Sequence, residues 1–355
     1  MNNPVSDFEH KFAHLCGTDY AIAVNSGTSA LHAALEAIEV RGYDVVMPAL
    51  CPAMDAFVIM HAGGRVVFAD VDPQTHLVTD ATLARAVTPN TKAIIAVSLH
   101  GLPCDMAPIM KFANSWGVHV IDDCAQCLFG LYNDYASGTV ADIGCFSFEK
   151  KKHMTTGSEG GMIVTRDEHL AIRARKFAGL GYKHMTADAG RTSLSAAEFQ
   201  NPDYERFDTI GLNYRMSEQQ AAIGIIELES VHYAIERRRQ IAGMFSQAIA
   251  GCKWMVAQDW NYSARHVYYS FAVEHTCGGW GDFYKLFCAK GGDGFYAMPQ
   301  VPYREPALSG RQTVLAPVAE RLQKNLMLFK THYRNMDEAK RQAEILAELI
   351  DEVGR

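Results

Sequence analysis

Along the first two-thirds of the chain, short apolar runs alternate with stretches whose apolar residues recur at helical spacing. The apolar runs predict strands, and polar loops separate them from the predicted helices. The predicted strands are 20–24, 43–48, 65–71, 92–99, 119–123, 142–148 and 160–165, and the predicted helices are 27–40, 53–62, 81–87 and 105–116. This alternation is typical of an α/β domain with a mainly parallel sheet.

The last third of the chain has a different pattern. From about residue 166 to 250 the apolar positions predict helices, including an arginine-rich helix at 235–245. A strand at 265–275 and a terminal helix at 336–353 then predict a smaller α+β unit. We expect a large α/β domain over residues 1–235 and a small C-terminal α+β domain over residues 236–355.

Composition and charge narrow the class of protein. The chain has 355 residues, 48% of them hydrophobic and 21% charged, which is ordinary for a globular protein. The net charge is −7 and the basic residues are dispersed, so the chain lacks the basic surface that binds nucleic acid. Neither a membrane span nor a signal peptide is apparent. We therefore expect a cytoplasmic protein that binds no nucleic acid and no membrane.

The nine cysteines are odd in number and scattered, which is typical of reduced thiols. Cys124 and Cys127 form a CxxC motif in "DDCAQCL". A zinc site would need a second ligand pair at suitable spacing, and we expect no metal. A redox pair stays open, but we favour the interpretation that these are small buried side chains.

Three loops that follow predicted strands carry candidate chemistry. In "NSGTSALHAAL", residues Ser26, Gly27 and Thr28 lie where a strand ends and a helix begins. The free backbone N–H groups and the hydroxyls at such a junction suit a phosphate, although an ordinary helix cap would have the same sequence.

The other two loops contain an acid and an amine. "VIDDCAQ" ends an apolar strand with Asp122 and Asp123, which could meet a cationic ligand or cap a helix. "FSFEKKKHMTTG" contains three consecutive lysines, 150–152, which could include a nucleophile or form a solvated turn. Ligands bind at the carboxyl ends of strands in such sheets. A phosphate cradle, an acid and an amine together are what pyridoxal phosphate requires.

Four motifs resemble the DegT/DnrJ/StrS family of sugar aminotransferases, a branch of the fold-type I pyridoxal-phosphate enzymes. They are "FEHKFAHLCGTDYAIAVNSGTSAL" from Phe8, "DDCAQ" from Asp122, "FSFEKKKHMTTGSEGG" from Phe146 and "GLNYRMSEQQAA" from Gly211. The resemblance covers nearly the whole chain. It implies a mainly parallel seven-stranded sheet between helices, followed by a smaller α+β domain.

The resemblance also assigns roles. Lys152, and not Lys150 or Lys151, matches the lysine that binds the aldehyde of the cofactor. Asp123 matches the carboxylate paired with the pyridine nitrogen, and Gln126 the residue beside the ring. Ser147, Gly27 and Thr28 match phosphate contacts, to which the hydroxyl of Ser26 adds a donor. Asn213 matches a residue that reaches the cofactor phosphate of the neighbouring subunit, which implies a homodimer with shared active sites.

The implied reaction is the transfer of an amino group from an amino acid, with glutamate favoured, to a keto sugar. A nucleotide-linked keto-deoxysugar or a keto sugar acid is expected, for cell-surface polysaccharide or secondary-metabolite synthesis. One alternative is a sugar dehydratase, in which histidine replaces the lysine; His153 is adjacent, but Lys152 occupies the motif position. A non-catalytic regulator is another, and would call for a DNA-binding module.

The chain departs from the family in three places. Only seven residues precede Phe8, where the family has a longer segment. Pro52 stands where an aromatic residue often stacks on the cofactor ring, so stacking would come from Pro52 or Met54. The C-terminal substrate segment is replaced by residues 291–306. Candidate contacts for an anionic substrate group are Lys150, Lys151, Lys183, His184 and Arg215, and candidates for sugar hydroxyls are Asp203 and Tyr204.

Overall fold

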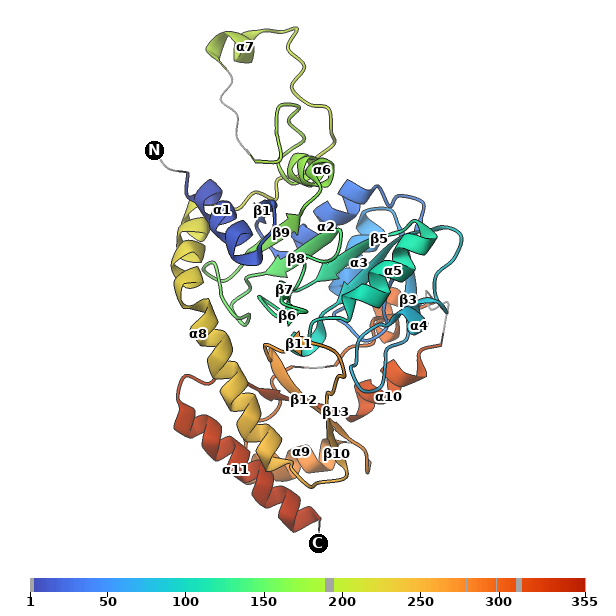
Figure 1. Cartoon of the computed structure of the whole chain (residues 1–355), viewed down its shortest axis with the longest axis vertical. Helices are drawn as coiled ribbons and strands as arrows, with labels where there is room; N and C mark the ends of the chain where they lie inside the picture. The colour runs from blue at the N-terminus through green and yellow to red at the C-terminus, as the bar shows by residue number, and fades with distance from the viewer. Residues whose placement is uncertain (1–2, 189–194, 279, 298, 311–314, 355) are drawn as a thin grey trace.

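A seven-stranded sheet forms the centre of the larger part of the molecule (Figure 1). The computed structural model describes residues 3–188, 195–278, 280–297, 299–310 and 315–354. The strands are β1 (Tyr20–Val24), β2 (Asp44–Pro48), β3 (Arg65–Ala69), β4 (Thr91–Val97), β5 (His119–Asp123), β8 (Ile143–Ser147) and β9 (Gly161–Thr165). Their order is β1-β9-β8-β5-β4-β2-β3, and of these only β9 runs antiparallel to its neighbours. The expected mainly parallel sheet is confirmed.

Helices cover the sheet. They are α1 (Pro4–Cys16), α2 (Gly27–Ile38), α3 (Met54–His61), α4 (Asp80–Leu83), α5 (Met106–Trp116) and α6 (Glu168–Ala178). Strands β2, β4 and β5 are buried over almost their whole length, as expected for parallel strands covered on both faces. The helix predicted at 81–87 was too long, because it ends at Leu83 and residue 84 begins a turn. Pro89 disfavours helical backbone angles at the residue before it, which limits how far a helix can extend toward it.

A smaller body follows the long helix α8 (Glu218–Ala248). Strands β10 (Met255–Ala257), β12 (Ser270–His275) and β13 (Leu326–Lys330) form an antiparallel sheet. Helices α9 (Trp280–Ala289), α10 (Pro317–Asn325) and α11 (Met336–Val353) accompany it. Helix α8 contributes to both parts of the core and passes through the proposed boundary at 235/236 without a break. The division into domains at that point stays a prediction.

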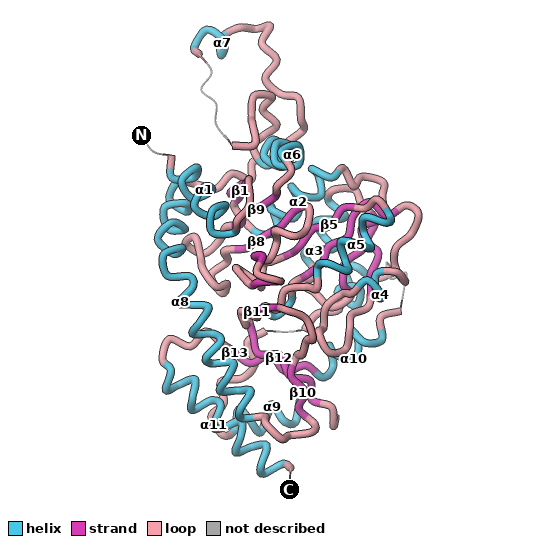
Figure 2. Tube along the Cα trace, in the orientation of Figure 1, coloured by secondary structure: helices cyan, strands magenta, loops and turns pink. Residues whose placement is uncertain are grey.

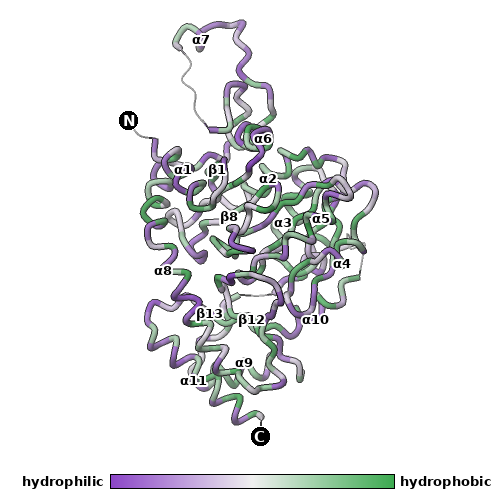
Figure 3. The backbone as a smooth tube through the Cα atoms, in the orientation of Figure 1, coloured by the Kyte–Doolittle hydropathy of each residue, from purple (hydrophilic) through white to green (hydrophobic). Residues whose placement is uncertain are grey.

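The prediction of helices throughout 166–250 was wrong between α6 and α8. In the described part of that stretch, the only helix is the short α7 (Ala196–Gln200). Figures 1 and 2 show this stretch as a loop that projects from the body, and Figure 3 shows that it is largely hydrophilic. Gly181 has a positive φ of 83°, which ends helical geometry soon after α6. A stretch without an apolar face cannot pack a helix onto a core.

The prediction of one strand at 265–275 was also wrong. The chain forms β11 (Ala264–Arg265), which pairs with β6 (Leu131–Tyr132) beside β7 (Tyr135–Ala136). Between β11 and β12, Tyr268 has a positive φ of 47°, which interrupts the extended backbone.

Among the described residues, no helix has the length and apolar composition needed to cross a membrane. Cys124 and Cys127 are buried free thiols, as small core side chains are. In the same described part of the chain, no group of His, Cys, Asp and Glu is arranged to hold a metal ion.

Candidate active site

The start of α2 and the end of β8 meet closely. Ser26 caps α2, because its Oγ accepts a hydrogen bond from the backbone N of Ser29 at 3.1 Å. A Cβ atom on Gly27 would lie 2.7 Å from Cβ of Ser147, so only glycine permits this approach. The hydroxyls of Ser26 and Ser147 therefore lie beside the N–H groups of a helix N-terminus, with Thr28 in its exposed first turn. This arrangement suits a phosphate.

The two aspartates at the end of β5 have different partners. Both carboxylate oxygens of Asp122 accept hydrogen bonds within the fold. Its Oδ1 accepts from Oγ of Ser98 at 2.9 Å, and its Oδ2 accepts from N of Gly138 at 2.8 Å. The Oδ1 of Asp123 accepts from N of Ala125 at 2.9 Å. Burial raises the pKa of Asp123 to about 6, although the Ala125 N–H and the charge of Lys152 oppose that rise. Asp123 is therefore the aspartate that faces the candidate amine.

Lys152 differs from the two lysines before it. Lys150 and Lys151 are exposed, whereas Lys152 is half-buried and its Nζ lies 4.8 Å from the ring centroid of Tyr269. The backbone O of Lys152 accepts from Nη2 of Arg238 at 3.2 Å. The structure thus places Lys152 between the end of β8 and the smaller body.

Gln126 lies on the same edge of the sheet. It follows β5, is half-buried, and its Oε1 accepts from the backbone N of His100 at 2.9 Å. This bond orients the side chain between the ends of β4 and β5.

Asn213 is exposed, and its Oδ1 accepts from Nε of Arg215 at 3.0 Å. Its segment runs beside the first loop, because N of Asn25 donates to O of Tyr214 at 2.8 Å. None of the hydrogen bonds or ion pairs in the described part of the chain joins Asn213 to Lys152 or Asp123. Its expected role across a dimer stays a prediction.

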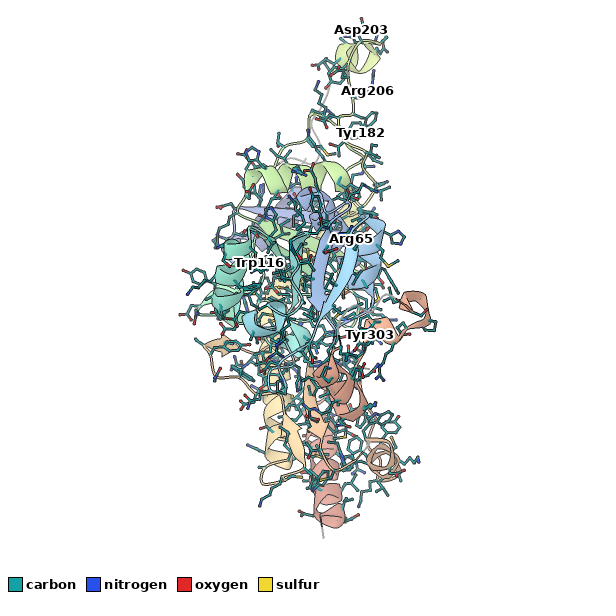
Figure 4. All side chains as sticks on the ribbon, turned by 90° about the vertical axis from the view of Figure 1, so that its right-hand side faces the viewer. Arg65, Trp116, Tyr182, Asp203, Arg206 and Tyr303 are labelled. Carbon is teal, nitrogen blue, oxygen red and sulfur yellow. The ribbon has the colours of Figure 1, made fainter. Side chains whose placement is uncertain are left out.

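Among the candidates for substrate contacts, Lys150 and Lys151 adjoin Lys152, whereas those on the projecting loop are not gathered around it. Lys183 forms an exposed ion pair with Glu205 at 2.6 Å. Figure 4 shows Asp203 at the outer end of the projecting loop, away from the body of its own chain. Tyr204 follows it on the same loop and His184 precedes it.

Arg215 lines a cavity of about 420 Å³ between α1, α6 and the start of α8. That cavity is lined neither by Lys152 nor by Asp123, and its Arg175 and Glu9 are paired at 2.9 Å. Pro52 is half-buried just before α3, and Met54 is 44% exposed. Whether either residue stacks on a cofactor ring stays a prediction.

The structure adds site residues that the sequence did not indicate. Tyr269 lies beneath Nζ of Lys152, and Tyr296 packs on Tyr269 with ring centroids 5.4 Å apart. Tyrosines in strands and loops are ordinary core residues, so no sequence signal marked them. Asp55 also lies near Lys152 and Asp123. It did carry a signal, because it is the only charged residue between positions 45 and 60.

A profile of the DegT/DnrJ/EryC1/StrS aminotransferase family matches residues 1–280. The chain is 36% identical over 271 residues to a GDP-perosamine synthase of Caulobacter vibrioides, covering 76% of this chain and 68% of the relative. It is 33% identical over 275 residues to a UDP-N-acetyl-3-dehydro-alpha-D-glucosamine 3-aminotransferase of Acidithiobacillus ferrooxidans, covering 77% and 69%.

Solved structures are similar over nearly the whole chain. An aminotransferase from Psychrobacter cryohalolentis superposes with a TM-score of 0.90 and 28% identity, covering 100% of this chain and 93% of that one. DesV of S. venezuelae, solved with a ketimine intermediate, superposes with a TM-score of 0.87 and 25% identity. The match covers 99% of this chain and 90% of that one.

Proposed function

Because the chain belongs to the DegT/DnrJ/EryC1/StrS aminotransferase family and is a transaminase of that kind, we propose that it aminates a nucleotide-linked keto sugar. The amino donor is an amino acid, and we propose glutamate. One observation carries the proposal: Lys152, Asp123 and the Ser26–Ser147 cradle all lie at the ends of strands on one edge of one sheet.

Pyridoxal phosphate is the proposed cofactor, in keeping with the family. The residues fit it: Ser26, Gly27, Thr28 and Ser147 would hold the phosphate, and Asp123 would pair with the pyridine nitrogen. Lys152 would bind the aldehyde, and Gln126 would lie beside the ring. When bound, the cofactor supplies an electron sink for the carbon whose proton is removed.

The chain itself supplies proton transfer and orientation. Lys152 would hold and move the proton as general acid and base. Arg238 holds the lysine loop, because its Nη2 donates to O of Lys152 and its Nη1 to O of Tyr269 at 3.1 Å. Tyr269 covers the amine from the smaller body. These contacts fix the position of the lysine loop and cover its amine.

The relatives support a nucleotide-linked acceptor. Their names include GDP-perosamine, a UDP-linked 3-dehydro sugar and dTDP-4-dehydro-2,3,6-trideoxy-D-glucose. A keto sugar acid, the other acceptor suggested by the motifs, has no such support. The product would serve cell-surface polysaccharide or secondary-metabolite synthesis, in the cytoplasm.

A homodimer with shared sites is part of the proposal. Asn213 lies on a segment that also exposes Ile210, at 96%, and Leu212, at 44%. On α8, Ile226 is 66% exposed and Tyr233 67%. Apolar side chains of this size are usually covered, and a second copy of the chain would cover them while bringing Asn213 to its cofactor.

The alternatives lack support in the geometry. A dehydratase would use a histidine at the lysine position, but His153 is buried and its Nε2 bonds to the backbone O of Val267 at 3.1 Å. A non-catalytic regulator would leave the cluster of Lys152 and Asp123 without a use.

The test is a screen of nucleotide-linked keto sugars with glutamate, in which the aminated product is detected by mass. We expect a product one amino group richer and an equal amount of 2-oxoglutarate. If only keto sugar acids or non-sugar ketones are aminated, the proposed class of acceptor is wrong. If only another amino acid serves as donor, the proposal of glutamate as donor is wrong.

A further inference from the structure

Asp55 is an acid that the proposed mechanism does not use. It lies in the first turn of α3 and is only 1% exposed. Its Oδ2 is buried and has no hydrogen-bond partner. A buried carboxyl oxygen without a donor is costly, and structures usually retain one only where a ligand or a proton satisfies it.

The groups around Asp55 come from four segments of the chain. Asp123 lies at the end of β5, Lys152 follows β8, Cys145 lies on β8 and Cys51 precedes α3. The Cys51 thiol already donates to the backbone O of Pro48 at 3.1 Å. Lys152 is the one cation among these groups, and its charge acts on the carboxyls of both Asp55 and Asp123.

One cation cannot neutralise two buried carboxylates, so the pair retains one proton. Hydrogen bonding decides which carboxyl holds it. Asp123 accepts the N–H of Ala125, which favours its ionised form, whereas Oδ2 of Asp55 has no hydrogen-bond partner and the nearby Cys51 thiol is only a weak donor. The pKa of Asp55 accordingly lies well above its usual range, chiefly through burial and then through the charge of Asp123.

We propose that Asp55 is a second acid of the cofactor site, a protonated carboxyl beside the ionised Asp123 that offers its unpartnered oxygen to the bound pyridoxal phosphate. This inference rests on the proposed function. A neutral acid in an apolar cavity is a hydrogen-bond donor, and it exchanges its proton with the neighbouring carboxylate. Asp55 and Asp123 then titrate as a pair, and the state of the pair sets how strongly the site holds the ring.

Two variants separate the functions of Asp55. Asp55→Asn keeps the shape and a donor but cannot ionise, and Asp55→Leu also removes the donor. The matched control is Asp80→Asn, an exposed carboxylate in the first turn of α4. In a pH titration of the visible absorption of the loaded protein, we expect Asp55→Asn to move the apparent pKa by about one unit or more. Asp55→Leu should also weaken cofactor affinity by roughly tenfold. The control should change neither.

The apoprotein provides a readout that does not depend on the cofactor. A raised folded pKa means that the folded state binds more protons than the unfolded state, so stability falls as pH rises from about 4. Removal of Asp55 removes its share of that loss, and the share of Asp123 remains. The melting temperature of apo Asp55→Asn should therefore exceed that of the wild type at pH 8, with the advantage lost at pH 4.

The outcomes are distinct. A spectrum like that of the wild type at every pH, with a lower melting temperature at both pH values, would show that Asp55 is only structural and overturn the inference. Wild-type protein that forms no reducible adduct with pyridoxal phosphate at Lys152 would instead contradict the proposed function, and this inference with it. If Asp55→Leu does not fold, the titration and melting curves of Asp55→Asn still decide.

Discussion

Charged residues occur in two contrasting settings in this molecule. At the edge of the large sheet, Asp55, Asp122 and Asp123 are at most 3% exposed. On the projecting loop, Lys183 and Glu205 are well exposed and pair with each other at 2.6 Å. Buried charges cost free energy unless their partners are complete, whereas exposed ion pairs contribute little to stability. Buried charged groups with incomplete partners therefore mark the candidate active site better than the number of charged residues does.

The largest effect is expected at Lys152. Lys152→Ala removes the amine that we propose binds the cofactor and moves the proton, so turnover should fall by about three orders of magnitude or more. The exposed Lys111→Ala on α5 is the control and should retain turnover. Borohydride reduction of the wild type followed by peptide mass mapping should place the cofactor on Lys152. A cofactor found on Lys150 or Lys151 would contradict the assignment.

Substitution of the two neighbouring aspartates should affect different properties, turnover at Asp123 and stability at Asp122. Asp123→Asn should lower turnover by about two to three orders of magnitude, because it removes the charge that we propose pairs with the pyridine nitrogen. Asp122→Asn cannot accept both existing hydrogen bonds, so it should lower the free energy of unfolding by about 1–3 kcal/mol. Urea unfolding and turnover per folded molecule measure both. If turnover survives in Asp123→Asn and not in Asp122→Asn, the roles are reversed.

A mixed dimer tests whether sites are shared. Lys152→Ala and Asn213→Asp should each be inactive, the second because it adds an anion at the position that we propose contacts the cofactor phosphate of the other subunit. In a mixed dimer of shared sites, one site carries both defects and the other carries none. Random mixing of equal amounts should then restore activity up to about a quarter of the wild type. Mass spectrometry should verify that the subunits have exchanged. If activity does not return in the mixed dimers, Asn213 acts in the site of its own subunit or has no role in catalysis.

The smallest effect is expected on the projecting loop. Lys183→Ala breaks an exposed ion pair, so the melting temperature should not change measurably. Turnover with saturating keto sugar should also stay unchanged unless Lys183 contacts the acceptor. A rise in KM for the acceptor alone would show that the loop does read the substrate, and a fall in melting temperature would contradict the contrast between the two settings.

The sequence by itself predicted the strands of the large sheet, most of its helices and the candidate reactive groups. The strands of the large sheet and the helix at 336–353 follow from local periodicity, and α11 has the predicted bounds. Lys152, Asp123 and Gly27 were marked by short motifs, because a strand end followed by a helix start or a turn is a local arrangement. Nothing in those motifs depends on distant parts of the chain.

Tertiary structure decided the rest. The strand expected at 265–275 breaks at Tyr268, where Gly101 approaches so closely that a Cβ on it would lie 2.6 Å from N of Tyr268. Asp55 became a candidate site residue only because the fold brings the first turn of α3 close enough to Asp123 and Lys152 for their charges to act on it. Periodicity reports which face of an element is apolar. It does not report which distant group arrives opposite a given side chain, and that juxtaposition sets burial, charge and protonation.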